Sequence, residues 1–127
     1  MTLKDFKSGQ TVYNLRIITG KSTEYSVTRY KVVSIGRKYV RATPDGSDIC
    51  PTEFYLEDED NEYLTENRDW GNRTLLFFTE SNINDYIEKI ELRKWFRNEI
   101  SEHKLRTYTL NQLRAIKAIL GGKLEEE

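Results

Sequence analysis

The stretch from residue 29 to 43, RYKVVSIGRKYVRAT, constrains the fold of this chain more than any other. Two runs rich in β-branched residues flank Gly36-Arg37, and a glycine at the first of two loop positions suits a type II′ turn. We therefore predict a β-hairpin in which Ile35 pairs with Lys38 and Val33 with Val40. Alternation along the strands then gives a core face of Val33, Ile35, Val40 and Ala42, and a mixed, cation-bearing face of Tyr30, Val32, Ser34, Tyr39 and Arg41.

Periodicity elsewhere predicts further strands and then helices. Apolar residues alternate over 11–19 and 24–35, and shorter strand-like runs occupy 49–56 and 73–79. From Ser81, the expected N-cap, apolar residues recur at helical spacing to about His103. Thr109 and Gln112 form a capping box for a second helix, which is expected to end at Gly121-Gly122.

This order of elements predicts an α+β fold in two parts. Short strands with tight turns indicate a small SH3-like antiparallel β-barrel over residues 1–80, and the helices indicate a C-terminal α-helical hairpin over residues 81–127. Trp95 and Phe96 lie on the apolar stripe of that hairpin. Because so short a helix pair is not stable alone, the stripe must pack on the barrel or on a second chain. We therefore expect a monomer or, through these helices, a homodimer.

Composition excludes several classes of protein. No apolar run approaches the roughly 18 residues that span a bilayer, so no membrane partner is expected. The opening MTLKDFKSGQ lacks the apolar core of a secretion signal. Cys50 is the single cysteine, so no internal disulfide can form, which suits a cytoplasmic protein. We expect Cys50 to be a small buried hydrophobe.

The net charge of −1 conceals three blocks of alternating sign. Residues 1–47 hold nine Lys and Arg against three Asp and Glu, and residues 48–91 hold three against thirteen. Residues 92–127 hold eight against five. A chain that is basic, then acidic, then basic predicts separate charged binding surfaces.

The segments LKDFKSGQTVYNL, KVVSIGRKYVRA, LFFTESNINDYIEKIEL and YTLNQLRAIKAIL resemble a loose family of small, uncharacterised β-barrel proteins. These proteins come from Gram-positive bacteria and their phages. The resemblance implies an SH3-like barrel with a C-terminal helical tail and an origin in a mobile element. It supplies no catalytic residues, and the acidic run at 57–62 is not part of its pattern.

Nothing in the sequence predicts catalysis. His103, the single histidine, lies near a helix end, where it interacts with the helix dipole. Cys50 has no histidine close to it in the sequence, and no HExxH, P-loop, GxSxG or GxGxxG string occurs. The oxygen-rich run at 57–62 lacks the spaced ligands and central glycine of a calcium loop. We therefore predict no enzymatic activity, no catalytic residue, no metal site and no cofactor.

The acidic block predicts a surface for a protein partner. Aromatic side chains among carboxylates can imitate DNA and occupy the basic groove of a nucleic-acid enzyme. The expected partner is a host protein of this kind, which the chain would inhibit as an anti-defence protein does. A flexible, solvated loop without a partner is the simpler alternative. The candidate residues are Glu57, Asp58, Glu59, Asp60, Glu62, Tyr63, Asp69 and Trp70.

The basic block predicts an alternative function, direct binding of nucleic acid. Cations that follow phosphates and aromatic rings that stack on bases are what a single strand requires. A sequence pI near 6.0 argues against a dedicated nucleic-acid binder. The cations could also pair with the acidic block of the same chain. The candidate residues are Arg29, Lys31, Arg37, Lys38, Tyr39 and Arg41.

Overall fold

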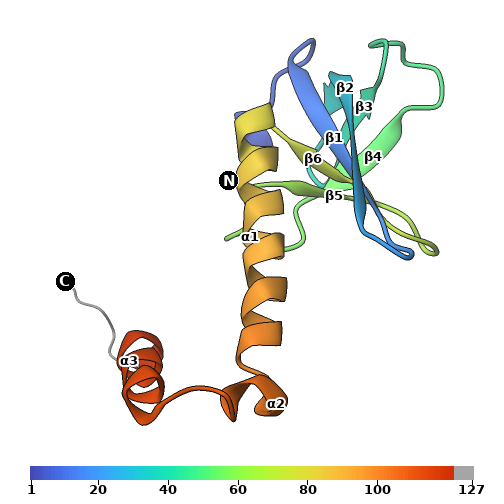
Figure 1. The fold of residues 1–127 in the computed structure, drawn as a ribbon. Helices are drawn as coiled ribbons and strands as arrows, with labels where there is room; N and C mark the ends of the chain where they lie inside the picture. The colour runs from blue at the N-terminus through green and yellow to red at the C-terminus, as the bar shows by residue number, and fades with distance from the viewer. Residues whose placement is uncertain (122–127) are drawn as a thin grey trace. The chain divides into compact units, whose positions relative to one another are not determined.

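The computed structural model describes residues 1–121 and contains a closed antiparallel barrel followed by helices (Figure 1). A short 3-10 helix, η1 (Leu3–Asp5), precedes the strands β1 (Thr11–Ile18), β2 (Glu24–Ile35), β3 (Val40–Thr43), β4 (Thr52–Tyr55), β5 (Leu64–Glu66) and β6 (Leu75–Phe77). The helices are α1 (Glu80–Glu99), α2 (Glu102–Leu105) and α3 (Leu110–Gly121). This order confirms the predicted α+β fold with a barrel and a helical tail. The helix end predicted at Gly122 lies outside the described residues.

The chain divides into two compact units inside α1, between Tyr86 and Ile87. The first unit holds the barrel and the first turns of α1. The second holds the rest of α1 with α2 and α3. Each unit is described by itself.

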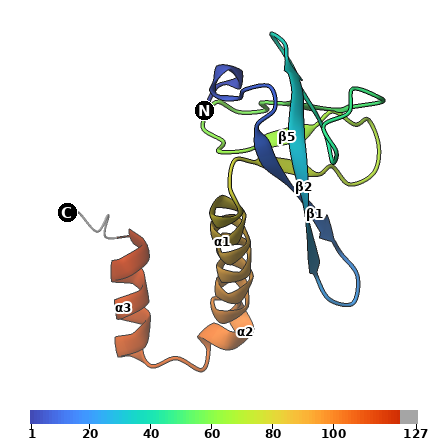
Figure 2. The same ribbon diagram turned by 90° about the horizontal axis from the view of Figure 1, so that it is seen from above.

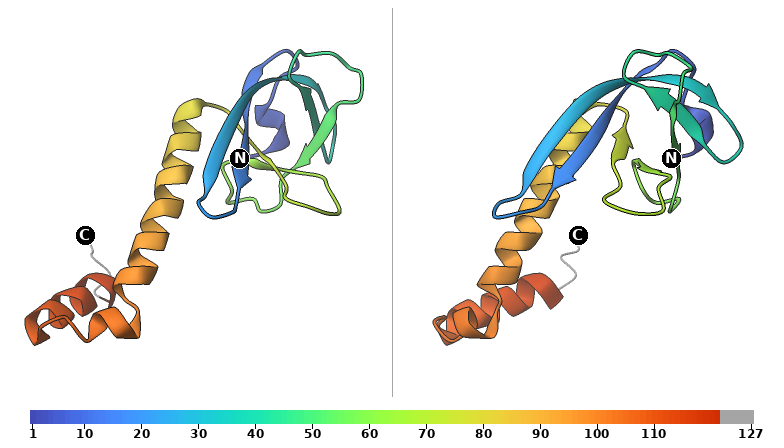
Figure 3. Two further views of the ribbon diagram at one scale, coloured as in Figure 1. Left: turned by 45° about the vertical axis from the view of Figure 1, so that its right-hand side comes forward. Right: turned by 90° about the vertical axis from the view of Figure 1, so that its right-hand side faces the viewer.

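Each barrel strand pairs with the next, and β6 returns to pair with Tyr13–Leu15 of β1. The pairing of β1 with β2 continues to Ile18 and Glu24, beyond the reach of β6. The β1–β2 hairpin therefore extends past the closed part of the barrel (Figures 2 and 3).

The hairpin between β2 and β3 is present, but its predicted turn and register are wrong. Ile35 pairs with Val40, so the loop spans four residues and is closed by the Gly36 N–H, which donates to the Tyr39 carbonyl at 2.8 Å. Gly36 does not adopt the positive φ of a type II′ turn. A bulge between Val32 and Ser34 then changes which residues face the core. Val32 is buried at 2% exposure, against our prediction, while Val40 and Ala42 are buried as predicted.

Apolar side chains of the first unit are buried both inside the barrel and outside it. Outside the barrel, Leu15 of β1, Phe77 of β6 and Ile83 of α1 are each at most 1% exposed. The Tyr86 ring lies 5.4 Å from that of Phe77, so the first turns of α1 cover the outer face of β1 and β6. The barrel interior is filled by Phe6, Val12, Val32, Val40, Ala42, Phe54, Leu64 and Leu76.

Side-chain caps determine where the helices begin and end. The Asn82 N–H donates to Thr79 Oγ1 at 3.1 Å, so Thr79 caps α1 in place of the predicted Ser81. The first helix ends at Glu99, short of the prediction, because the Ser101 side chain accepts the Lys104 N–H and starts α2. The predicted capping box of α3 is confirmed: Thr109 N–H donates to Gln112 Oε1 at 2.8 Å, and Gln112 N–H donates to Thr109 Oγ1 at 3.2 Å.

Cys50 contradicts the expectation of a buried strand residue. It is exposed, and its φ of 50° places it in the left-handed region. The turn before it is held by side chains, since Asp45 Oδ1 accepts the Ser47 N–H at 3.0 Å and Ser47 Oγ accepts the Ile49 N–H at 3.1 Å. These bonds keep the backbone in a turn, so β4 begins only at Thr52.

Candidate functional site

The acidic run forms an exposed loop between β4 and β5, here called the carboxylate loop (residues 57–62). Five of its six side chains are carboxylates, and all five are exposed. None of them has an ion-pair partner among the residues that the structure describes. The carboxylates are Glu57, Asp58, Glu59, Asp60 and Glu62.

Hydrogen bonds and ring packing hold the carboxylate loop in place. Asp58 Oδ1 accepts the Asp60 N–H at 3.0 Å, and the Asp58 carbonyl accepts the Asn61 N–H at 3.0 Å. Tyr63, which follows the loop, packs with its ring centroid 5.3 Å from Phe77 and 5.2 Å from Tyr86. The loop is thus fixed by a local turn and by an aromatic anchor at its end.

Asp69 and Trp70 lie away from the carboxylate loop. They belong to the β5–β6 loop, which leaves β5 at the opposite end from the carboxylate loop. The Trp70 side chain is 74% exposed, and the Arg68 guanidinium lies 4.7 Å from the centroid of its ring. The eight predicted partner residues therefore form two groups, with Tyr63 beside the five carboxylates and Asp69 beside Trp70.

The predicted nucleic-acid residues are spread over the barrel. Arg29 and Lys31 are exposed on β2, opposite Tyr13 and Thr11 of β1. Arg37 and Lys38 are exposed in the β2–β3 loop. The structure therefore places these four cations on two different parts of the barrel.

Two of the predicted cations lie near carboxylates of the same chain. Arg41 on β3 forms an ion pair with Glu53 on β4, with 2.8 Å between Nη2 and Oε2. Arg37 lines the same groove as Glu59 and Asp60 of the carboxylate loop, without forming an ion pair with them. Tyr39 is half-buried, and Lys38 Nζ lies 5.5 Å from its ring centroid. The basic hairpin is therefore not one continuous cationic face.

Sequence reasoning missed a groove between the β1–β2 turn and the β5–β6 loop, here called the arginine groove. It is lined by Arg16, Ile17, Ile18, Thr19, Arg68 and Asn72. Arg68 connects this groove to Trp70, on whose ring it stacks. The sequence did contain a local signal: Arg68 and Arg73, two of the three cations within residues 48–91, flank Trp70.

Arg73 fixes the loop that carries Trp70. Its Nη1 donates to the Tyr55 hydroxyl at 3.0 Å, and its Nε donates to the Arg68 carbonyl at 3.0 Å. Arg68 Nη1 in turn donates to the Asn72 carbonyl at 3.5 Å. These bonds tie both ends of the loop to each other and to β4.

A polar network is buried where β1, β5 and β6 meet. Asn14 Nδ2 donates to Thr74 Oγ1 at 2.8 Å, and the Thr74 hydroxyl donates to Glu66 Oε1 at 3.0 Å. Burial raises the pKa of the nearby Tyr30, as does the charge of Glu66, while Arg16 opposes the rise. The network links Asn14 of β1 and Glu66 of β5 to Thr74, the residue that precedes β6.

Within residues 1–121, no three His, Cys, Asp or Glu side chains gather so that they could hold a metal ion. His103 lies in the four-residue helix α2. None of α1, α2 and α3, as far as the structure describes the chain, combines the length and apolar character that crossing a membrane requires.

The barrel and its helices define the chain as a small antiparallel β-barrel domain with a helical tail. A family model described as the Phage ProQ C-terminal-like domain matches residues 1–127, so the chain belongs to this family. This match supports the phage-type part of the resemblance seen in the sequence. No curated protein and no solved structure matches the chain.

Proposed function

We propose that this domain is a non-enzymatic binding module of a phage protein, and that it docks on a basic surface of a host protein through the carboxylate loop. A nucleic-acid-targeting enzyme of host defence presents such a surface, which the loop would occupy as an inhibitor. One observation carries this proposal: five carboxylates stand exposed on a fixed loop, and no cation within residues 1–121 forms an ion pair with them.

The physical argument rests on charge and preorganisation. Unpaired carboxylates attract a basic partner over a distance and increase its association rate. Ordering a flexible loop on binding costs free energy, and a loop that is already ordered avoids much of that cost. The Asp58 turn and the packing of Tyr63 supply this order.

The test compares two variants of equal charge. In the first, Glu57→Gln, Asp58→Asn, Glu59→Gln and Asp60→Asn remove four charges from the carboxylate loop. In the control, Glu24→Gln, Asp48→Asn, Asp85→Asn and Glu88→Gln remove four charges from exposed positions elsewhere. Each protein is used to capture partners from a lysate of the host, at low and at high salt.

We expect the unmodified domain and the control to retain one host protein at low salt and to lose it at high salt. The loop variant should retain it at least tenfold less. Equal retention by the loop variant, or equal loss by the control, would overturn the proposal, because the effect would then not belong to the loop.

The arginine groove favours a second candidate function, binding of single-stranded nucleic acid. One face of Trp70 carries Arg68, and a base could stack on the other face, while Arg16 and Arg68 contact phosphates. This replaces the scattered basic hairpin as the nucleic-acid candidate. Trp70→Leu with Arg16→Gln should weaken binding of a labelled oligonucleotide, whereas Arg37→Gln with Lys38→Gln should not. The reverse result would return the function to the hairpin.

A further inference from the structure

The helical unit, as far as the structure describes it, lacks a buried core of its own. Between Ile87 and Gly121 no side chain is buried, whereas the barrel unit has a closed apolar core. Eight of the twelve large hydrophobic side chains that are exposed in the described chain belong to this short stretch. They are Leu92, Trp95, Phe96, Ile100, Leu110, Leu113, Ile119 and Leu120.

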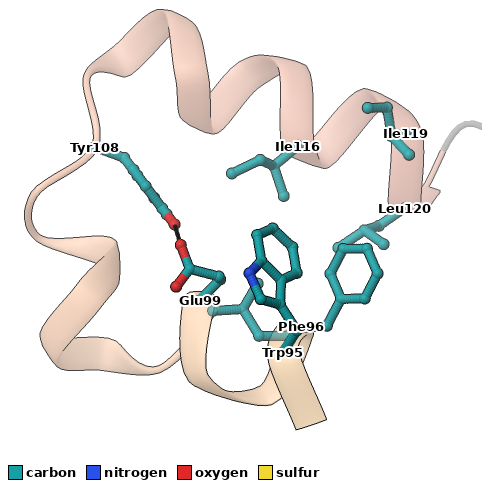
Figure 4. Close-up of a pocket in the computed structure, with 8 residues that line it drawn as sticks. Trp95, Phe96, Glu99, Tyr108, Ile116, Ile119 and Leu120 are labelled. Carbon is teal, nitrogen blue, oxygen red and sulfur yellow. Dashed lines mark hydrogen bonds between the residues drawn. The ribbon is translucent and has the colours of Figure 1, made fainter. Parts of the chain in front are cut away.

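Five of these side chains line an apolar cleft between the end of α1 and α3 (Figure 4): Trp95, Phe96, Ile100, Ile119 and Leu120. Trp95 and Phe96 of α1 meet edge to face with ring centroids 5.0 Å apart. Ile116 of α3 points toward Trp95 across the cleft. The polar contact in the lining is the hydrogen bond from the Tyr108 hydroxyl to Glu99 Oε1, 2.9 Å long, which ties the connection before α3 to the last turn of α1.

We propose that a second copy of this chain covers the cleft, so that two helical units pair about a two-fold axis. Two helices of this length do not hold their apolar faces in water without a partner. The surface offers both halves of a self-complementary contact, as a two-fold interface requires. Trp95, Phe96 and Ile119 line the cleft. Leu110 and Leu113 lie outside it, three residues apart on one face of α3, and would form the ridge that enters the cleft of the second copy.

The area and the charge of the surface suit this occupant. An aromatic side chain presents about 150–250 Å², and Trp95 and Phe96 are 55% and 48% exposed. With six aliphatic side chains of similar exposure, the apolar surface approaches the roughly 800 Å² that each partner buries in a standard interface. Helix α3 carries only two charged side chains, Arg114 and Lys117, in agreement with the depletion of charge in interface cores.

The first experiment measures the mass of the full chain in solution by sedimentation, from low to high micromolar concentration. We expect about twice the 15.0 kDa of one chain. Leu113→Glu on the ridge and, separately, Phe96→Glu in the cleft should each reduce the mass twofold. Trp70→Ser removes another exposed aromatic side chain, which lies on the barrel unit, and should leave the dimer intact. A monomer at every concentration would overturn the proposal.

A second measurement distinguishes a second copy from other occupants of the cleft, and it leaves the residues of the cleft unchanged. In a Trp70→Phe chain, Trp95 is the remaining tryptophan and reports on the cleft. Its emission should shift to shorter wavelength as the protein concentration is raised and the dimer forms. A short-wavelength emission at a concentration where the chain sediments as a monomer would mean that the same chain covers the cleft. If removal of residues 122–127 then abolished it, the occupant would be that segment. Either outcome would overturn the second copy.

Discussion

Arg41 on β3 and Glu53 on the adjacent strand β4 form an ion pair, with 2.8 Å between Nη2 and Oε2. This ion pair is where the basic first block meets the acidic second block. The pairing stops there, because the five carboxylates of residues 57–62 have no ion-pair partner among the described residues. In the folded chain, the acidic run at 57–62 therefore remains separate from the basic first block.

We predict that this ion pair contributes little to stability. The Arg41 and Glu53 side chains are 42% and 31% exposed, so water and salt screen their attraction. A double-mutant cycle with Arg41→Met and Glu53→Gln, measured by urea unfolding, should give a coupling of about 0.2–1 kcal/mol. The coupling should shrink in 1 M salt. A coupling above about 2 kcal/mol would show that the pair is a main support of the barrel rather than a surface contact.

Two threonines near β5 should respond to the same substitution with opposite sign. Thr74 Oγ1 bonds both Asn14 and Glu66, so Thr74→Val removes two hydrogen bonds from a buried network and should cost about 1–3 kcal/mol. Thr65 Oγ1 is buried without a hydrogen-bond partner, so Thr65→Val should be neutral or stabilise by up to about 1 kcal/mol. Thermal unfolding of the two variants gives the comparison. Equal destabilisation would mean that the Thr65 hydroxyl has a partner in solution, such as a bound water.

Ile83 should hold the first turns of α1 on the barrel. It is 1% exposed, so its truncation would leave a cavity in a buried apolar site. Ile83→Ala should therefore cost about 2–4 kcal/mol in the free energy of unfolding. The next residue, Asn84, is exposed, so Asn84→Ala is the matched control and should change stability by less than about 0.5 kcal/mol. If both variants unfold alike, the packing of α1 on β1 and β6 is not a source of stability.

Local patterns predicted the elements well and their joins less well. The strand β1, the barrel class and the Thr109–Gln112 capping box follow from alternation and capping chemistry within a few residues. The bulge beside Val32 is different, because a pattern of period two does not show where an extra residue enters a strand. That bulge placed Val32 inside the barrel.

Of the two candidate sites, one could be predicted from the sequence and the other could not. The carboxylate loop is contiguous in the sequence, so composition alone identified it. The arginine groove joins Arg16 with Arg68, which lie 52 positions apart and come together only through the barrel. Asp69 and Trp70 were grouped with the carboxylate loop because they are near it in the sequence. The short strand β5 sends the two loops out from its opposite ends.

The hydrogen bond from Tyr108 to Glu99 predicts how the helical unit responds to alkaline pH. The bond to Glu99 is the largest cause that raises the pKa of Tyr108 above its ordinary value of 10.0, followed by burial and the charge of Glu99. Since the folded pKa exceeds the unfolded one, the contribution to stability is complete below about pH 10 and is lost as pH rises through the folded value. The helical content of the domain should therefore fall above pH 10.

Tyr108→Phe lacks the bond at every pH, so it should be less helical at pH 8 and should lose less helical content as the pH is raised further. The difference between the two chains isolates Tyr108 from the other seven of the eight tyrosines. Parallel curves would contradict a stabilising bond, because its loss would then leave the pH dependence unchanged.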